Sequence, residues 1–383
     1  MSAADGEPAL RIMHCFRSPV GGIFRHVRDL IDEQIAEGHQ VGIICDDNTG
    51  GNLEESLLEA VRPKLALGLH RVSMERAISP SDLAVTWKLY RQVKALNLDI
   101  LHSHGAKGGA YARIIGTLLR MRSSRPARLY CPHGGSIHYD KTKIGGRVFF
   151  TLERIMERFT DRLIFVSSYE KNGYFEKVGE PPCPWSLVYN GLTEAEFDPV
   201  EPAKDATDFL YVGMMRDLKG VDLFLDALPL IADNAGPNIS ATLVGEGPDL
   251  ARYKDRAKAF DERIQVRFFD AMPVREAFKL GRVMVVPSRA ESMPYIVLEA
   301  LAARIPLVAT RVGGIPEIYA EHAEQLVEPA SSSALAQKMG DALHCPSALS
   351  HTGALLPRIK DRFSTTTMAA SIMDAYKATI SNK

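Results

Sequence analysis

Two glutamates in the C-terminal third of the chain are the side chains best placed to bind or act on a substrate. Glu291 and Glu299 flank a predicted helix start in the stretch VMVVPSRAESMPYIVLEALAARIPLVATRVGGIPEIY, residues 283–319. A helix start presents unpaired N–H groups that bind anions, and carboxylates accept hydrogen bonds from hydroxyl groups. Together these groups suit a polyol that carries a phosphate, and a nucleotide sugar fits that description.

The elements that would position these carboxylates form a strand, helix, strand unit. Residues 283–286 and 307–309 are short apolar runs that are typical of buried parallel strands. Ser292 is predicted to cap the first helix, and a second helix is predicted to start at Pro316 after a pair of glycines. Both turns fall at the carboxyl ends of neighbouring strands, where open α/β sheets bind ligands.

Apolar runs alternate with amphipathic segments along the whole chain, which predicts parallel sheets with helices on both faces. A break rich in proline, GEPPCPW, places the domain linker between residues 179 and 194. A capped helix is predicted from Phe363 onward. The predicted strands are residues 12–16, 41–45, 100–103, 129–131 and 163–167, then 209–212, 241–244, 266–269, 283–286, 307–309 and 325–327.

Basic residues and glycine-rich turns follow other predicted strands. Arg216 and Lys219 lie in the loop of YVGMMRDLKG, and LVGEGP is a second glycine-rich turn. Two cations and free amides in one loop can hold a diphosphate. In the first half, Gly21 and Gly22 form a turn before a helix, where backbone amides can approach a phosphate.

Histidines end two predicted strands of the first half, in HSHGAKGG and CPHGG. His102, His104 and His133 at these ends are either hydrogen-bonded structural residues or groups that act on a sugar hydroxyl or a phosphate. The spacing of His102 and His104 also raises the question of zinc, but no third ligand follows at a convincing spacing. The sequence therefore predicts no metal site.

Length and composition restrict the class of protein. A chain of 383 residues suggests two or three domains, and 46% hydrophobic with 24% charged residues is typical of globular proteins. The formal net charge of −1 gives no reason to expect a nucleic-acid partner. The N-terminus lacks the features of a signal peptide, and the longest nonpolar stretch, residues 295–310, is broken by charges and a proline. We therefore expect a cytoplasmic location.

The five cysteines are scattered and show no CxxC spacing, so neither a disulfide framework nor a metal site is expected. Three of them lie in or beside apolar strand runs and are predicted to be small core residues in a reducing compartment. The cysteines are Cys15, Cys45, Cys131, Cys183 and Cys345.

Positive charge concentrates in residues 101–165, which hold 12 Lys and Arg against 4 Asp and Glu. A helix predicted over residues 147–159 lies in this segment, with apolar residues on one broad face and Arg147, Arg154 and Arg158 off it. The apolar face is either part of the core or a surface for shallow membrane contact. The basic residues are either solvated or bind anionic lipid or a phosphorylated acceptor.

Taken together, these motifs resemble the retaining glycosyltransferases of the GT-B fold, in particular glycosyltransferase family 4, the glycosyl transferases group 1. SPVGGIFRHV, DILHSHGAKGG, VYNGLTEAEF, YVGMMRDLKG, LVGEGP, VVPSRAESMPYIVLEALA and PLVATRVGGIPEI appear in the family's order. The resemblance implies an α/β fold of two Rossmann-like domains with parallel sheets facing a central cleft. It also implies an acceptor domain over residues 1–185, a donor domain over 186–365, and a C-terminal helix over 366–383 that crosses back to the first domain.

The resemblance implies roles for individual residues of the donor domain. Glu291 would contact hydroxyls of the transferred sugar and Glu299 those of the ribose. Lys219 and Arg216 would neutralise the charge that develops on the leaving nucleoside diphosphate. The donor would also contact Gly213 and the turn at Ser292, Met293 and Pro294, whose backbone amides face the diphosphate.

The first domain would supply further contacts. Gly21 and Gly22 would approach the phosphates of the donor, and His133 would lie beside its sugar. The acceptor-binding residues are not identified by any motif; His104, Lys107 and Asn190 are the candidates.

The implied reaction is transfer of a hexose, with retention of configuration, from a UDP- or GDP-sugar to a sugar or lipid-linked acceptor in polysaccharide or glycolipid biosynthesis. No metal or other cofactor is expected, since Asp46 and Asp47 are adjacent and form no DxD pair. Two positions depart from the family pattern: Met214 stands where an arginine is usual, and Asp270 where a glycine is common. A nucleotide-sugar 2-epimerase and a nucleotide-sugar-binding protein without turnover remain alternatives.

Overall fold

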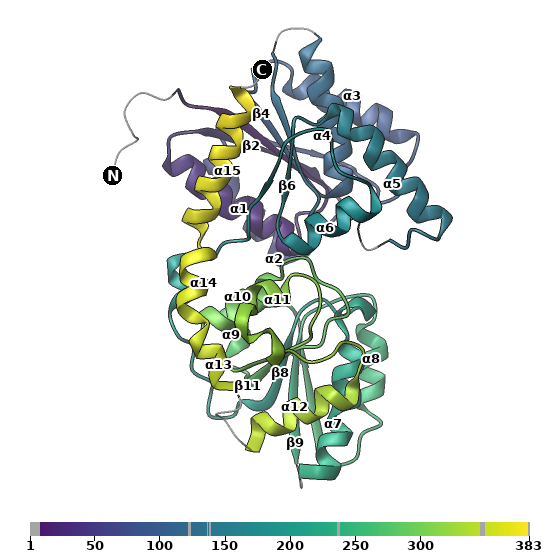
Figure 1. Cartoon of the computed structure of the whole chain (residues 1–383), viewed down its shortest axis with the longest axis vertical. Helices are drawn as coiled ribbons and strands as arrows, with labels where there is room; N and C mark the ends of the chain where they lie inside the picture. The colour runs from purple at the N-terminus through teal and green to yellow at the C-terminus, as the bar shows by residue number, and fades with distance from the viewer. Residues whose placement is uncertain are drawn as a thin grey trace. The chain divides into compact units, whose positions relative to one another are not determined.

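The structure is a computed structural model that describes residues 8–121, 124–135, 137, 139–235, 238–344 and 349–381. The chain divides into two compact units (Figure 1). The first unit comprises Met1–Gly191 and Thr365–Lys383, and the second comprises Leu192–Ser364. Each unit has its own parallel sheet and its own core, which confirms the prediction of two Rossmann-like α/β domains.

The first unit is built on a parallel sheet whose described strands follow the order β3-β2-β1-β4-β5-β6-β7. All five residues of β4 are buried, as expected for a strand that helices cover on both faces. The strands are β1 (Arg11–Phe16), β2 (Gln40–Asp46), β3 (Leu69–Val72), β4 (Ile100–His104), β5 (Ala127–Cys131), β6 (Arg162–Phe165) and β7 (Trp185–Leu187).

Alternate residues of these strands face two separate cores. Cys15 of β1 packs with residues of α3 and α4, while Phe16 packs with residues of α1 and α2 on the opposite face. The α-helices of the first unit that precede the second unit in the sequence are α1 (Gly21–Ala36), α2 (Asn52–Val61), α3 (Ser81–Val93), α4 (Gly105–Arg120), α5 (Ile144–Met156) and α6 (Ser168–Lys177).

The last helix, α15 (Thr365–Ile380), packs against α1 in the first unit, as Figure 1 shows. Thr365 Oγ1 donates to Glu33 Oε1 at 2.9 Å, and Arg162 Nε donates to Thr379 Oγ1 at 2.8 Å. The predicted return of the C-terminal helix is therefore confirmed. The helix begins at Thr365 rather than at Phe363, whose ring is buried in the second unit.

The second unit has a smaller parallel sheet with the strand order β10-β9-β8-β11-β12. Its strands are β8 (Thr207–Val212), β9 (Ile239–Val244), β10 (Ile264–Phe269), β11 (Gly281–Val286) and β12 (Leu307–Ala309). Its helices are α7 (Val221–Ala235), α8 (Leu250–Ala257), α9 (Val274–Phe278), α10 (Tyr295–Ala302), α11 (Ile315–Tyr319), α12 (Ser332–His344), α13 (Ser350–Ala354) and α14 (Leu356–Arg362).

The edges of the sheets differ from the prediction. β3 and β7 were not predicted, and β7 falls inside the stretch assigned to the linker. Both are edge strands whose residues are mostly half-buried or exposed, so they lack the apolar run that marks a buried strand. The strand predicted over residues 325–327 forms only an isolated bridge between Val327 and Thr310.

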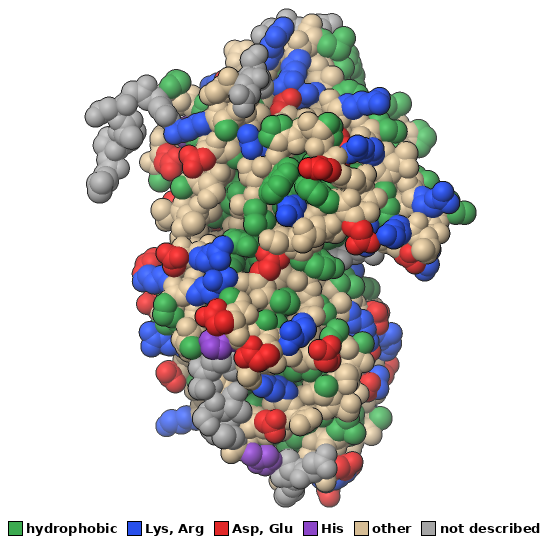
Figure 2. Space-filling model, in the orientation of Figure 1, with side chains coloured by type: hydrophobic (Ala, Val, Ile, Leu, Met, Phe, Trp, Pro, Cys, Tyr) green, Lys and Arg blue, Asp and Glu red, His purple; other side chains and the backbone are tan. Residues whose placement is uncertain are grey.

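The helix α5 exposes a stripe of apolar side chains instead of burying it. Ile144, Val148, Leu152 and Ile155 recur along one side of the helix and are all exposed, whereas Phe150 lies on the buried side. Green hydrophobic and blue basic side chains stand next to one another where α5 runs (Figure 2). The core interpretation of this face is therefore wrong for Val148, Leu152 and Ile155.

The cysteines and the apolar character of the helices can also be compared with the sequence predictions. Cys15, Cys45 and Cys131 are buried free thiols, as predicted, and Cys183 is a half-buried free thiol; Cys345 lies outside the described residues. Among the helices of the described residues, none combines the length and the apolar character that crossing a bilayer requires.

Candidate active site

Lys219 and Glu291 meet where the loops after β8 and β11 come together. Lys219 ends a short 3-10 helix, Asp217–Lys219, and Glu291 lies in the turn between β11 and α10. Lys219 Nζ donates to Glu291 Oε1 at 2.6 Å. β8 and β11 are neighbours in the parallel sheet, so the loops at their carboxyl ends lie side by side.

The Glu291 carboxylate is held in a fixed position and is almost fully buried. Glu291 is only 7% exposed, and its Oε1 also accepts a hydrogen bond from Ser288 Oγ at 2.7 Å. The Lys219 side chain is 29% exposed, and one of its three N–H groups donates to Glu291. Glu291 can therefore accept a hydrogen bond from a hydroxyl while Lys219 donates to an anionic oxygen.

Arg289 joins the two loops that carry this pair. Its guanidinium binds the Asp222 carboxylate through both terminal nitrogens, at 2.8 Å and 2.6 Å, and Nη1 also donates to the carbonyl of Asp217 at 2.6 Å. Burial opposes ionisation of Asp222, but hydrogen bonds from Arg289 outweigh it and lower the pKa of this carboxyl. A bidentate pair fixes orientation as well as distance, so Arg289 holds the loop of Lys219 against the loop of Glu291.

Two glycines allow these loops to pack closely. Gly220 has φ +68° and Gly313 has φ +60°, a left-handed backbone that favours glycine. A Cβ at Gly220 would overlap the carbonyl oxygen of Pro287, and a Cβ at Gly313 would overlap that of Glu291. The turn after β12 therefore lies directly against the backbone of Glu291.

The loop after β8 packs on the loop after β9. Gly213 N donates to Val244 O at 3.0 Å, and Met215 N donates to Glu246 O at 2.8 Å. Within this loop Lys219 N donates to Arg216 O at 2.9 Å, while the half-buried Arg216 guanidinium has no hydrogen bond or ion pair with a described residue. Arg216 is therefore available for an anionic ligand.

The helix α10 starts later than predicted. Its N-cap is Pro294, with φ −74° and ψ 120°, so Ser292 does not cap it. The residue before a proline is disfavoured in the helical region, and this keeps Met293 out of the helix. Ser292 Oγ is buried without a hydrogen-bond partner among the described residues, and Glu299 lies inside α10 with 8% exposure.

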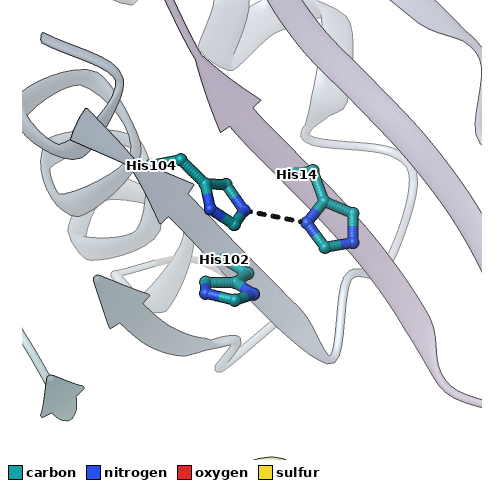
Figure 3. A group of neighbouring side chains, drawn as sticks. All are labelled: His14, His102 and His104. Atoms are coloured by element: carbon teal, nitrogen blue, oxygen red, sulfur yellow. Dashed lines mark hydrogen bonds between the residues drawn. The ribbon is translucent and has the colours of Figure 1, made fainter. Parts of the chain in front are cut away.

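In the first unit, histidines gather on one face of the sheet. His14 of β1 pairs in register with His102 of β4, and His104 follows two residues later on the same face (Figure 3). His14 Nδ1 lies 3.1 Å from His104 Nε2, and His104 Nδ1 lies 3.0 Å from His133 Nε2. His26 of α1 stacks edge-on against His133. Sequence spacing did not reveal His14 and His26, because the fold joins them to His102 and His104 from distant segments.

Burial keeps these imidazoles neutral. Removal from water lowers the pKa of His14 to about 4, although a hydrogen bond with Gln34 acts in the opposite direction. Burial likewise lowers the pKa of His26 to about 4 and that of His102 and His104 well below the ordinary value. At neutral pH each of these rings therefore offers one lone pair.

The acceptor candidates are engaged within the first unit. His104 is buried, and both its ring nitrogens contact other histidines. Lys107 Nζ donates to Asp82 Oδ2 at 2.7 Å, and the buried Asn190 contacts His26 Nδ1 through Oδ1 at 3.1 Å. Any of the three would have to give up or share such a contact to bind an acceptor hydroxyl.

The remaining predicted residues of the first unit lie at the starts of helices and turns. Gly21 begins α1 with φ +62°, and both Gly21 and Gly22 are exposed, so their amides are accessible to a ligand. His133 has φ +51° and is half-buried. In the second unit, Met293 and Pro294 follow Glu291 closely in the sequence, and both are buried.

The sequence models of two families match adjoining parts of the chain. Glycosyltransferase Family 4 matches residues 20–196, and Glycosyl transferases group 1 matches residues 193–354. The two matches follow one another along the chain and divide it close to the boundary between the two units, Gly191 and Leu192.

Individual relatives agree with these matches. Over 200 residues the chain is 28% identical to a subunit of the phosphatidylinositol N-acetylglucosaminyltransferase of Arabidopsis thaliana, a match that covers 51% of this chain and 42% of the plant protein. Over 295 residues it is 25% identical to the UDP-Gal:alpha-D-GlcNAc-diphosphoundecaprenol alpha-1,3-galactosyltransferase of Escherichia coli, a match that covers 73% of this chain and 73% of the bacterial protein.

Solved structures share the fold. The Anabaena protein Alr3699/HepE, crystallised with UDP and glucose, superposes with a TM-score of 0.75 at 14% identity. The superposition covers 95% of this chain and 99% of the Anabaena chain. The likeness therefore extends over both units.

Proposed function

Because the chain belongs to glycosyltransferase family 4, the glycosyl transferases group 1, and transfers sugar from a nucleotide-sugar donor, we propose a specific reaction for it. The enzyme moves a hexose, with retention of configuration, from a UDP- or GDP-sugar to a sugar or lipid-linked acceptor. The transfer needs no metal ion on the diphosphate. The names of the plant and bacterial relatives, which refer to phosphatidylinositol and to a diphosphoundecaprenol, favour a lipid-linked acceptor.

The observation that carries this proposal is the contact between Lys219 and Glu291. The ammonium group supplies positive charge where the nucleoside diphosphate leaves, and the carboxylate accepts hydrogen bonds from hydroxyls of the transferred sugar. Glu291 is kept in place by Ser288, so it binds the sugar in one orientation. Charge placed in advance of the reaction stabilises the transition state more than charge that must rearrange.

The proposal of metal-free transfer rests on the cations of the loop after β8. Lys219 has N–H donors left after its contact with Glu291, and the Arg216 guanidinium is available to an anion. Arg216 then takes the part of the arginine that Met214 replaces. The leaving phosphate accepts the proton of the acceptor hydroxyl, so Glu291 is not required as a base.

A donor screen tests the reaction. UDP- and GDP-hexoses are incubated with lipid-linked and free sugar acceptors, with and without EDTA, and the products are analysed by mass and by the NMR coupling of the anomeric proton. We expect one donor class to give a product of retained configuration at an unchanged rate in EDTA. Inversion, or a loss of rate in EDTA that Mg²⁺ restores, would contradict the proposal. Isomerised nucleotide sugar without acceptor would instead indicate a 2-epimerase, and donor binding without release would indicate a silent binding protein.

We further propose that the enzyme reaches a lipid-linked acceptor by peripheral contact with anionic membrane at the cytoplasmic face, through residues 101–165. The exposed stripe of α5 supplies the apolar contact, and the exposed Arg147, Arg154 and Arg158 supply positive charge beside it. Apolar insertion and attraction to anionic headgroups add in interfacial helices. Ile144, which is 82% exposed, stands at the start of the stripe.

Vesicle sedimentation tests this contact. The wild type should bind vesicles of phosphatidylglycerol and phosphatidylcholine, and high salt should release it because salt screens the charges. The double variant Ile144→Ser, Leu152→Ser should bind less, while Leu83→Ser on α3, which removes a side chain that is 78% exposed, serves as the matched control. Equal binding to neutral vesicles, or an unaffected double variant, would contradict the contact.

A further inference from the structure

We propose that His14, His102 and His104 bind a transition-metal ion of the Zn²⁺ class in the first unit. The parallel register of β1 and β4 places the three side chains on one face of the sheet, and Figure 3 shows them converging from these two strands. All three residues are buried, and one nitrogen of each lies within 4.8 Å of a nitrogen of the others. The site is separate from Lys219 and Glu291, which belong to the second unit.

The distance between ligand atoms fits a metal ion. His14 Nδ1 and His104 Nε2 lie 3.1 Å apart. Two nitrogens bound to a tetrahedral Zn²⁺ at about 2.0–2.1 Å lie about 3.3 Å from one another. A small rotation of either ring would therefore admit the ion between them.

The outer nitrogen of each ring already has a partner. His14 Nε2 contacts Gln34 Oε1 at 2.9 Å, His102 Nδ1 contacts Tyr376 Oη at 2.7 Å, and His104 Nδ1 contacts His133 Nε2 at 3.0 Å. A histidine that binds a metal almost always uses its second ring nitrogen in such a contact, which fixes the tautomer and the ring orientation. All three rings show this arrangement.

Among the three rings of the proposed site, His102 Nε2 is a group that hydrogen bonding does not explain. It is buried and has no hydrogen-bond partner among the described residues. A buried polar atom left in this state is unfavourable unless water or an ion satisfies it. Nε2 is also the nitrogen that remains to His102 for a metal, because Nδ1 is engaged with Tyr376.

A purely hydrogen-bonded network is the competing interpretation. Gln34, His14, His104 and His133 form a chain in which each ring nitrogen donates to or accepts from the next, and one set of tautomers satisfies the whole chain. That network leaves His102 Nε2 unexplained. The metal site accounts for the same contacts and for this atom.

The chemistry of the three rings selects the class of ion. They are neutral imidazoles, and neutral imidazole binds Zn²⁺, Co²⁺, Ni²⁺ and Cu²⁺, whereas Mg²⁺ and Ca²⁺ prefer oxygen ligands. A second group, His26, His104 and His133, shares His104 but includes the half-buried His133. The second group also contains a buried nitrogen without a partner among the described residues, His26 Nε2. We assign the ion to the first group because all three of its residues are buried, so water competes less for their nitrogens.

Metal binding to the full chain tests the proposal. The wild type is stripped with EDTA and titrated with Zn²⁺ by calorimetry, and with Co²⁺ by visible absorption. We expect one equivalent of Zn²⁺ to bind, with a Co²⁺ spectrum of four- or five-coordination. His102→Gln should abolish both signals, while His344→Gln, which replaces an exposed histidine of α12, should leave them unchanged.

Tyr376→Phe is a second variant that tests the site if His102→Gln fails to fold. It removes the partner of His102 Nδ1 but no ligand, and it should weaken Zn²⁺ binding by about 10–100-fold. The circular dichroism spectrum and the cooperativity of urea unfolding report whether each variant is folded. Absence of a stoichiometric Zn²⁺ site in the wild type, or an undiminished site in folded His102→Gln, would overturn the proposal and leave a hydrogen-bonded network only.

Discussion

Lys219 Nζ and Glu291 Oε1 lie 2.6 Å apart, although 72 positions separate the two residues in the sequence. The contact joins a cation suited to a diphosphate with a carboxylate suited to sugar hydroxyls. Each residue therefore holds the other in place, and a change at one is expected to affect the binding of both parts of the donor.

Lys219→Ala should lower kcat by about 100–1000-fold, the range found when one preorganised donor to a developing anion is removed. Arg216→Ala should lower it less, because the Arg216 guanidinium is not fixed by a partner among the described residues. Steady-state rates of nucleoside diphosphate release measure both. Lys279→Ala, which breaks an exposed Lys–Glu pair in the same unit, is the control. A Lys219→Ala rate equal to that of the control would contradict the assignment.

Arg289→Lys should lower kcat by about 10-fold while donor affinity changes little, because a lysine cannot reproduce the two parallel bonds to Asp222. The loop of Lys219 would then be held less tightly. Arg263→Lys is the matched control, since it alters an exposed Arg–Asp pair of the same unit. Equal kinetics for the two variants would show that Arg289 does not position Lys219.

Gly313→Ala should destabilise the second unit by more than about 1 kcal/mol and reduce activity, because φ +60° disfavours alanine and its Cβ would overlap the carbonyl oxygen of Glu291. Gly340→Ala is the control: it lies inside α12, and a Cβ there meets no atom within 4 Å. Alanine at position 340 should leave stability unchanged or raise it slightly. Urea unfolding compares the two, and an equal effect at both positions would contradict the packing argument.

The ion pair of Arg289 and Asp222 should make stability depend on pH in acid. The pKa of Asp222 is lowered from 3.8, so its contribution is present above that value and is lost as the pH falls through the pKa of the folded state. Wild type and Arg289→Gln should therefore differ in unfolding free energy at pH 7 and converge below pH 3.8. A difference that stays constant down to low pH would show that the pair makes no ionic contribution.

The sequence predicted most of the buried strands and the loops that end them. β8 and β11 are apolar runs, and parallel pairing alone brings the loops at their carboxyl ends together. The loops of Glu291 and Lys219 were therefore accessible to sequence reasoning, whereas the return of α15 was implied only by the family resemblance. Edge strands such as β7 were not accessible, because a strand that is only partly buried needs no apolar run.

Contacts that depend on three-dimensional packing could not be predicted from the sequence. Arg289 lies in a loop and Asp222 in the first turn of α7, where charged residues are common, and only the pairing of β8 with β11 makes them partners. His14 is one polar residue in an apolar strand, and only the register with β4 places it beside His102. The predicted start of α10 is too early, because the effect of Pro294 on Met293 outweighs the capping preference of Ser292.

The rate of nucleoside diphosphate release by Glu291→Gln tests the central claim most directly. Glutamine keeps the shape of the side chain but loses the charge that binds Lys219 and the capacity to accept all the sugar hydroxyl hydrogen bonds. With the preferred donor and acceptor at saturation, we predict that kcat falls by at least about 100-fold while the variant remains folded and still binds the nucleoside diphosphate of that donor. A folded Glu291→Gln enzyme with the kcat of the wild type would contradict the account.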